Sequence, residues 1–107
     1  MKIYTYEGYT LKIGTSAREN DELITNAHPD DIWLHLEKFS SPHGILSPAG
    51  TDAHAIAWAA GLVKENSARR CRNLKNIGVQ YIPVKYVEKT STPGCVALKK
   101  KPRLIKV

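Results

Sequence analysis

One stretch of the sequence gathers side chains that could do chemistry. It reads "DIWLHLEKFSSPHGIL" and carries Trp33, His35, Ser41 and His43. An imidazole can act as an acid, a base or a metal ligand near neutral pH. A serine hydroxyl can act as a nucleophile beside a base, and an indole can stack on a nucleic-acid base or fill a core. Catalysis, metal binding, nucleic-acid contact and ordinary packing are therefore the four roles to weigh.

The spacing of the histidines does not favour a metal site. His28, His35, His43 and His54 are 7, 8 and 11 residues apart, and no H-E-x-x-H motif occurs. Structural and catalytic zinc sites usually take their ligands from shorter, recognisable spacings. We expect no metal and no other cofactor.

Two catalytic arrangements can be drawn from the same stretch. A hydrolase built from Ser41, His43 and Asp31 would lack the G-x-S-x-G turn that presents such a serine. A metal-independent ribonuclease could use His35 and His43 as acid and base. Alternatively, His43 could hydrogen-bond the neighbouring serine hydroxyls and fix a turn. The ribonuclease and the structural role both stay open.

Alternation in this stretch predicts a β-strand with two different faces. Ile32, Leu34 and Leu36 share one face, whereas Trp33 and His35 share the other. A helix packed on the second face would bury both rings. We expect Trp33 to be buried and His35 to be partly exposed.

The surrounding chain predicts an α+β fold with a mixed or antiparallel sheet and two main helices. Glu7-Gly8 favours a hairpin between two strands, and Ser16 with Glu19 forms a capping box for a short helix that His28-Pro29 ends. A second helix is expected from about residue 53 to 67, capped by Thr51 or Asp52. The remaining segments are, in order, a basic loop or frayed helix end at 68–76, a strand at 77–87, a turn, and two final strands around Pro102. Pro83 within the strand marks an edge, a bulge or the strand end. We expect one domain over residues 1–107.

Charge is distributed unevenly along the chain. Residues 1–63 hold four basic and eight acidic residues, whereas residues 64–107 hold twelve basic and two acidic ones, so the net charges are −4 and +10. A basic half of this kind favours a polyanion partner, most often a nucleic acid. The leading contact candidates are Arg69, Arg70, Arg72, Lys75, Lys85 and Lys89, and the second-rank candidates are Lys38, His35 and His43. In an extended strand Lys85 and Lys89 would share a face and could follow one phosphate track.

Composition indicates a globular protein with no membrane association. The chain has 107 residues, of which 42 % are hydrophobic, and it lacks a long apolar run or a signal-peptide pattern. Its two cysteines, Cys71 and Cys95, form no C-x-x-C motif and are expected to be reduced thiols. We expect a cytoplasmic location.

The pattern as a whole resembles the NFACT-R domain family. The most specific elements are Asn20-Asp21-x-Leu23, Asp31-x-Trp33-x-His35, Ser41-x-His43 and the run from Tyr81 to Lys89 that leads to Pro93-Gly94. The resemblance covers nearly the whole chain. Its hallmark positions are Asn20, Asp21, Asp31, Trp33, His35, Ser41 and His43, and we refer to them as the motif residues.

This resemblance implies a domain that binds RNA and is not an enzyme. Members of the family occur in ribosome-associated quality-control factors, which bind the large ribosomal subunit and tRNA, and as stand-alone domains followed by a coiled coil. The sequence therefore favours binding of structured RNA, such as tRNA or ribosomal RNA, with the ribosome as a further possible partner. DNA binding and a protein-adaptor role remain as alternatives, and the sequence does not indicate an oligomeric state. The chain departs from the family pattern at Leu34, Pro42 and Gly44.

Overall fold

The computed structural model describes residues 1–48 and 52–107 and has the expected α+β architecture. The six-stranded sheet has the order β1-β2-β4-β3-β5-β8, and all its neighbours are antiparallel. These strands are β1 (Lys2–Tyr6), β2 (Tyr9–Ile13), β3 (Ile32–Leu36), β4 (Gly44–Ser47), β5 (Gly78–Pro83) and β8 (Arg103–Lys106). A separate antiparallel pair is formed by β6 (Val87–Lys89) and β7 (Val96–Leu98).

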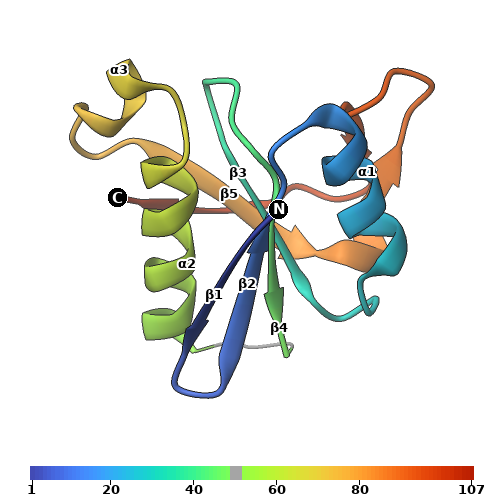
Figure 1. Cartoon of the computed structure of the whole chain (residues 1–107), viewed down its shortest axis with the longest axis horizontal. Coiled ribbons are helices and arrows are strands. Elements are labelled where there is room, and N and C mark those ends of the chain that lie inside the picture. Colours follow the sequence, from blue (N-terminus) through green and yellow to red (C-terminus); the bar gives the residue numbers. More distant parts are fainter. Residues whose placement is uncertain (49–51) are drawn as a thin grey trace.

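Helices cover both faces of the six-stranded sheet. Figure 1 shows α2 (Ala53–Glu65) on one side of it and α1 (Ala17–Asn26) on the other, with the orange β6-β7 ribbon near α1. Two hydrophobic clusters match these layers. One joins α2 to the face of Ile32, Leu34 and Leu36, and the other joins α1 and β6 to Trp33. The alternation expected for β3 is therefore confirmed.

Local sequence explains where these elements begin. The β1-β2 hairpin turns through Glu7 and Gly8, both at positive φ (49° and 84°), which is the backbone that a two-residue type I′ turn requires. Ser16 caps α1 by accepting from the Glu19 N–H at 3.1 Å. Asp52 caps α2 by accepting from the His54 N–H at 2.8 Å, and Thr51 lies outside the described residues. An N-terminal cap of this kind stabilises a helix by about 1 kcal/mol.

Small residues let α2 approach the sheet closely. Ala55, Ala59 and Ala60 are fully buried in the cluster beneath it. On the strand side, a Cβ on Gly44 would lie 2.8 Å from a methyl carbon of Val63. Gly44, one of the departures from the family pattern, is therefore required by the packing of α2 on β4.

The structure corrects two expectations in the basic half. The segment at 68–76 contains a helix of its own, α3 (Arg69–Arg72), and is not simply a loop or the frayed end of α2. The strand expected at 77–87 ends at Pro83 and is followed by a 3₁₀ turn over Val84–Tyr86. Lys85 lies in that turn and Lys89 in β6, so the expected lysine track along one strand face is wrong. Proline lacks the N–H needed to continue the ladder, which explains the break.

The two final strands exist but belong to different sheets. β7 pairs with β6, whereas β8 pairs with β5 and forms one edge of the six-stranded sheet. Arg103 and Lys106 on this edge are exposed. Charged residues on an outer strand discourage pairing with another chain. In the described part of the chain, no helix is long and apolar enough to span a lipid bilayer.

Candidate nucleic-acid interface

An open hollow of about 700 Å³ lies at the end of β3, and its floor is made by aromatic rings. Trp33, His35 and His43 form this floor. Residues 37–41, between β3 and β4, form one wall, and residues 93–96 with Leu98 form the other. We call this feature the histidine hollow. Pockets for small-molecule ligands commonly have volumes of about 300–1,000 Å³.

The three rings of the floor touch one another in a defined arrangement. Trp33 and His35 stack with centroids 5.6 Å apart and planes only 6° apart. His43 meets both of them edge-on, at 5.5 Å from Trp33 and 5.3 Å from His35. Trp33 is 2 % exposed, as expected, because α1 covers it, and His35 is half-buried at the open end of the stack.

His43 is a structural residue in this arrangement. Its side chain is 2 % exposed, and its Nδ1 accepts a hydrogen bond from the Trp33 indole N–H at 3.2 Å. The proton of the neutral ring therefore lies on Nε2, where it can serve the hydrogen bond with the Gly94 backbone. Burial, and next the neighbouring His35, lower the pKa of His43 to about 4. A protonated His43 would lose its bond from the indole.

His35 differs from His43 because one of its nitrogens is open. Its Nδ1 lies 2.6 Å from the Leu36 carbonyl oxygen and donates to it. Among the residues that the structure describes, Nε2 has no hydrogen-bond partner. Every fully buried side-chain nitrogen or oxygen there does have a partner, so Nε2 is not fully buried. Nε2 is therefore accessible from the hollow. Burial lowers the pKa of His35, so the ring is neutral near pH 7.

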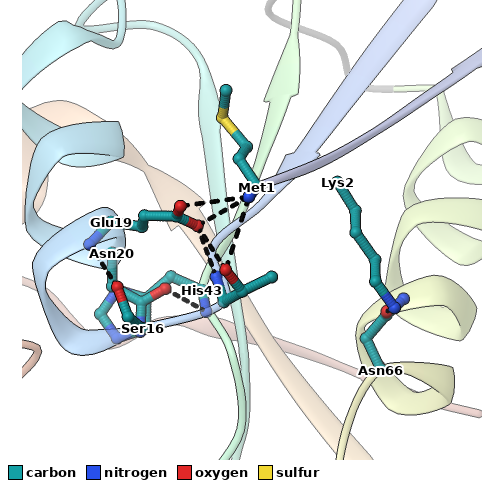
Figure 2. Close-up of polar contacts among 8 residues, drawn as sticks. Met1, Lys2, Ser16, Glu19, Asn20, His43 and Asn66 are labelled. Atoms are coloured by element: carbon teal, nitrogen blue, oxygen red, sulfur yellow. Dashed lines mark hydrogen bonds and ion pairs between the residues drawn. The ribbon is translucent and has the colours of Figure 1, made fainter.

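Most other motif residues hold backbone segments around the hollow. Asn20 accepts from the His43 N–H at 3.2 Å (Figure 2), and Asp21 accepts from the Gly94 N–H at 3.1 Å. Ser41 accepts from the Leu36 N–H at 3.1 Å. Asp31 accepts from the His28 N–H at 3.0 Å at the other end of β3, outside the hollow. These bonds fix β3, β4, α1 and the loop after β6 relative to one another.

The start of α1 is anchored beside this site. Figure 2 shows the Met1 ammonium group meeting the carboxylate of Glu19, and the two groups are 2.9 Å apart. Hydrogen bonds from this ammonium group and then from Thr15 lower the pKa of Glu19 to about 2. Glu19 reaches the Thr15 N–H rather than that of the capping Ser16, so the second half of the expected capping box is displaced by one residue.

A basic cluster lies next to the histidine hollow. It comprises the exposed residues Arg69, Arg70, Arg72 and Lys75, which we call the α3 basic cluster. None of them takes part in an ion pair with another described residue. The Arg70 guanidinium lies over the Phe39 ring, 6.0 Å from its centroid, and Phe39 belongs to the wall of the hollow. Figure 1 shows α3 and the turn between β3 and β4 at the same end of the molecule.

The other predicted cations are placed differently. Lys38 lines the histidine hollow and is exposed. Lys85 pairs with Asp30 at 3.2 Å, and Lys89 donates to the Thr25 hydroxyl. Both therefore lie against α1 and the loop that follows it, where they have protein partners. Lys85 and Lys89 were predicted to act with the cations of the α3 basic cluster, but the fold separates them from it.

Several lining residues were missed by the sequence analysis. Gln80 lies opposite His35 in the register of β3 and β5 and also lines the hollow. Phe39 is the only phenylalanine of the chain and lies in a loop, which was a usable signal for a site residue. Cys95, an exposed free thiol, is brought to the opposite wall by the Asp21–Gly94 bond. Among the described residues, no group of three or more potential ligands is arranged to hold a metal ion.

Comparisons with known proteins agree with this description. Residues 1–100 match the family model described as the NFACT protein RNA binding domain. The chain is 36 % identical over 89 residues to coiled-coil domain-containing protein 25 of Danio rerio, covering 78 % of this chain and 42 % of that protein. The protein of the same name in Bos taurus is 34 % identical over the same coverage. The chain thus spans less than half the length of these relatives.

A solved structure has the same fold. The C-terminal part of the fibronectin/fibrinogen-binding protein from Streptococcus suis superposes with a TM-score of 0.87. The match covers 98 % of this chain and 43 % of that one, at 21 % sequence identity. At this identity the likeness concerns the fold alone.

Proposed function

Because the chain belongs to the family of NFACT protein RNA-binding domains, we propose that it binds structured RNA, such as tRNA or ribosomal RNA. The binding surface is the end of the molecule that carries the α3 basic cluster and the histidine hollow. In this proposal the domain works in the cytoplasm, in association with the ribosome and with quality control of translation. Family membership supports RNA binding in general. The kind of RNA, the cytoplasmic location and the link to the ribosome are what we propose in addition.

The position of the α3 basic cluster is our reason for choosing this end of the molecule as the RNA-binding surface. Its four side chains are exposed, have no ion-pair partner in the described part of the chain and adjoin the hollow through Arg70 and Phe39. Free cations of this kind neutralise phosphates and release condensed counterions, which supplies much of the affinity for nucleic acid. Lys85, Lys89 and Lys99 have protein partners and are weaker candidates.

The chemistry of the hollow supports binding rather than turnover. A ribonuclease mechanism with two histidines needs one acid and one base that can both reach the substrate. Nδ1 of His43 is engaged by the Trp33 indole N–H, and the side chain is buried. His35 would then have to act without the second histidine. We therefore propose a non-enzymatic role.

Affinity for RNA as a function of salt tests the proposal. Fluorescence anisotropy with labelled tRNA should show binding that weakens steeply as salt is added. If roughly four phosphates are neutralised, the log–log slope should be about −3 to −4. Unlabelled structured RNA should compete better than duplex DNA. Absence of binding, or affinity independent of salt, would overturn the proposal.

A further inference from the structure

The stack on β3 ends in an open aromatic face. One face of His35 is covered by Trp33, whose ring lies parallel to it, and the edge of His43 closes a second side. The two stacked residues are two positions apart on one strand, so the stack runs along β3 towards residues 37–41. Those residues form a wall of the histidine hollow, which His35 also lines. The second face of the His35 ring therefore borders the hollow.

Groups that can form hydrogen bonds surround this open face. The accessible Nε2 of His35 is an acceptor in the neutral ring because Nδ1 carries the proton. The Gln80 amide, which lies opposite His35 on β5, offers both a donor and an acceptor, and the exposed Glu37 carboxylate offers acceptors. Amides and carboxylates are among the side-chain groups that pair with the edges of nucleic-acid bases.

The charge of the floor favours a base over a phosphate. His35 is neutral near pH 7, and so is His43, because burial lowers the pKa of each ring. A neutral aromatic floor beside the Glu37 carboxylate offers little attraction to a phosphate, whereas it can stack on an uncharged base. Cations lie at the rim instead, where Lys38 lines the hollow and Arg70 lies over Phe39.

We propose that the histidine hollow holds one unpaired nucleotide of the bound RNA, with its base stacked on the open face of His35. The edge of the base meets Gln80, Glu37 and Nε2 of His35, while its backbone passes Lys38 towards the α3 basic cluster. This inference rests on the proposed RNA-binding function and adds to it a requirement for an unstacked base. A base inside a duplex is stacked on its neighbours and cannot enter such a site without leaving the helix.

The test compares one RNA hairpin with a single-stranded 3′ overhang and the same hairpin with a blunt end. The wild-type protein should bind the overhang hairpin about tenfold more tightly, since stacking on one aromatic side chain is worth roughly that factor or more. His35→Ala should abolish the difference in affinity between the two hairpins. His35→Phe retains a stacking face and should restore most of the preference. Gln80→Ala should reduce the preference partially.

A measurement on the unmodified protein guards against a variant that does not fold. The ring resonances of His35 in the NMR spectrum should shift when the overhang hairpin is added and remain unchanged with the blunt hairpin. Equal affinity of the wild type for both hairpins, with an unchanged His35 ring signal, overturns the nucleotide site and leaves RNA binding intact. Failure to bind either hairpin or tRNA overturns both this inference and the proposed function.

Discussion

The indole N–H of Trp33 donates to Nδ1 of His43 at 3.2 Å in the interior of the protein. This bond fixes the tautomer of His43. Asn20 also accepts from the His43 N–H and Asp21 accepts from the Gly94 N–H, so hydrogen bonds join β3 and the start of β4 to α1 and the loop after β6. His35, stacked on Trp33 outside these hydrogen bonds, is the motif histidine whose nitrogen reaches the hollow.

Replacement of Trp33 should act mainly on stability rather than on RNA binding. Trp33→Ala removes a buried ring that packs against Leu23, Ile24 and Ile82, so we expect the free energy of unfolding to fall by about 3–5 kcal/mol. Trp33→Phe keeps an aromatic ring but leaves the buried Nδ1 of His43 without a donor, which should cost about 1–3 kcal/mol. Urea denaturation measures both changes. Wild-type midpoints for the two variants would show that the ring is not buried as described.

Alanine substitutions at two glycines, Gly14 and Gly61, test how closely the backbone packs against Asn20. A Cβ on Gly14 would lie 2.1 Å from Oδ1 of Asn20, the atom that accepts from the His43 N–H. Gly14→Ala should therefore destabilise the protein by about 1–3 kcal/mol through overpacking. A Cβ on Gly61 in α2 would meet no described atom within 4 Å, so Gly61→Ala should raise stability by about 0.5–1 kcal/mol. Thermal unfolding of the two variants should shift in opposite directions.

Local patterns predicted the parts of this fold that depend on neighbouring residues. Alternation in β3 separated Trp33 and His35 from the aliphatic face, and the Asp52 cap marked the start of α2. The hollow depends instead on a long-range bond between Asp21 and Gly94, which are far apart in sequence. Local patterns contain no such distance, so they could not place Cys95 or Gln80 among the residues that line the hollow. Pro83 was one expected end of the strand, but the lysine track assumed an extended strand beyond it, where the chain turns.

Protonation of His43 should destabilise the protein at pH values above those at which carboxylates titrate. The pKa of His43 is about 4 in the folded protein, compared with 6.5 for an unburied histidine, so the unfolded chain binds the proton first. The stabilisation is complete above about pH 6.5 and is lost as the pH falls towards 4, by roughly 2–4 kcal/mol. His35, whose pKa is also lowered, adds to the loss in the same direction.

Urea midpoints measured across this pH range check the prediction. His43→Gln should be less stable than the wild type at neutral pH and should show a shallower loss between pH 6.5 and 4. Glu19 provides an internal reference because its pKa is lowered to about 2, so its contribution is present above its usual value of 4.5 and is lost only between 4.5 and 2. The same pH dependence in His43→Gln and the wild type would contradict the assignment to His43.

The α3 basic cluster should control affinity without controlling stability. Changing Arg69, Arg70 and Arg72 to alanine removes three exposed cations, and we expect weaker RNA binding and a log–log salt slope smaller by about 2–3. The urea midpoint should change little because exposed positions contribute little to the core. A variant with Lys99, Lys100 and Lys101 changed to alanine loses the same charge elsewhere. Equal losses of affinity in the two triple variants would show that only net charge matters.

NMR mapping of the RNA-bound surface tests the central claim most directly. The isotope-labelled protein is titrated with the overhang hairpin, and changes in backbone amide signals are followed along the chain. We predict the largest changes at residues 69–75, at 35–41 and at 93–96, which form the α3 basic cluster and the histidine hollow. The β1-β2 hairpin should remain unchanged and serves as the internal control. Changes confined to that hairpin or to β8, with residues 35–41 and 69–75 unaffected, would contradict the account.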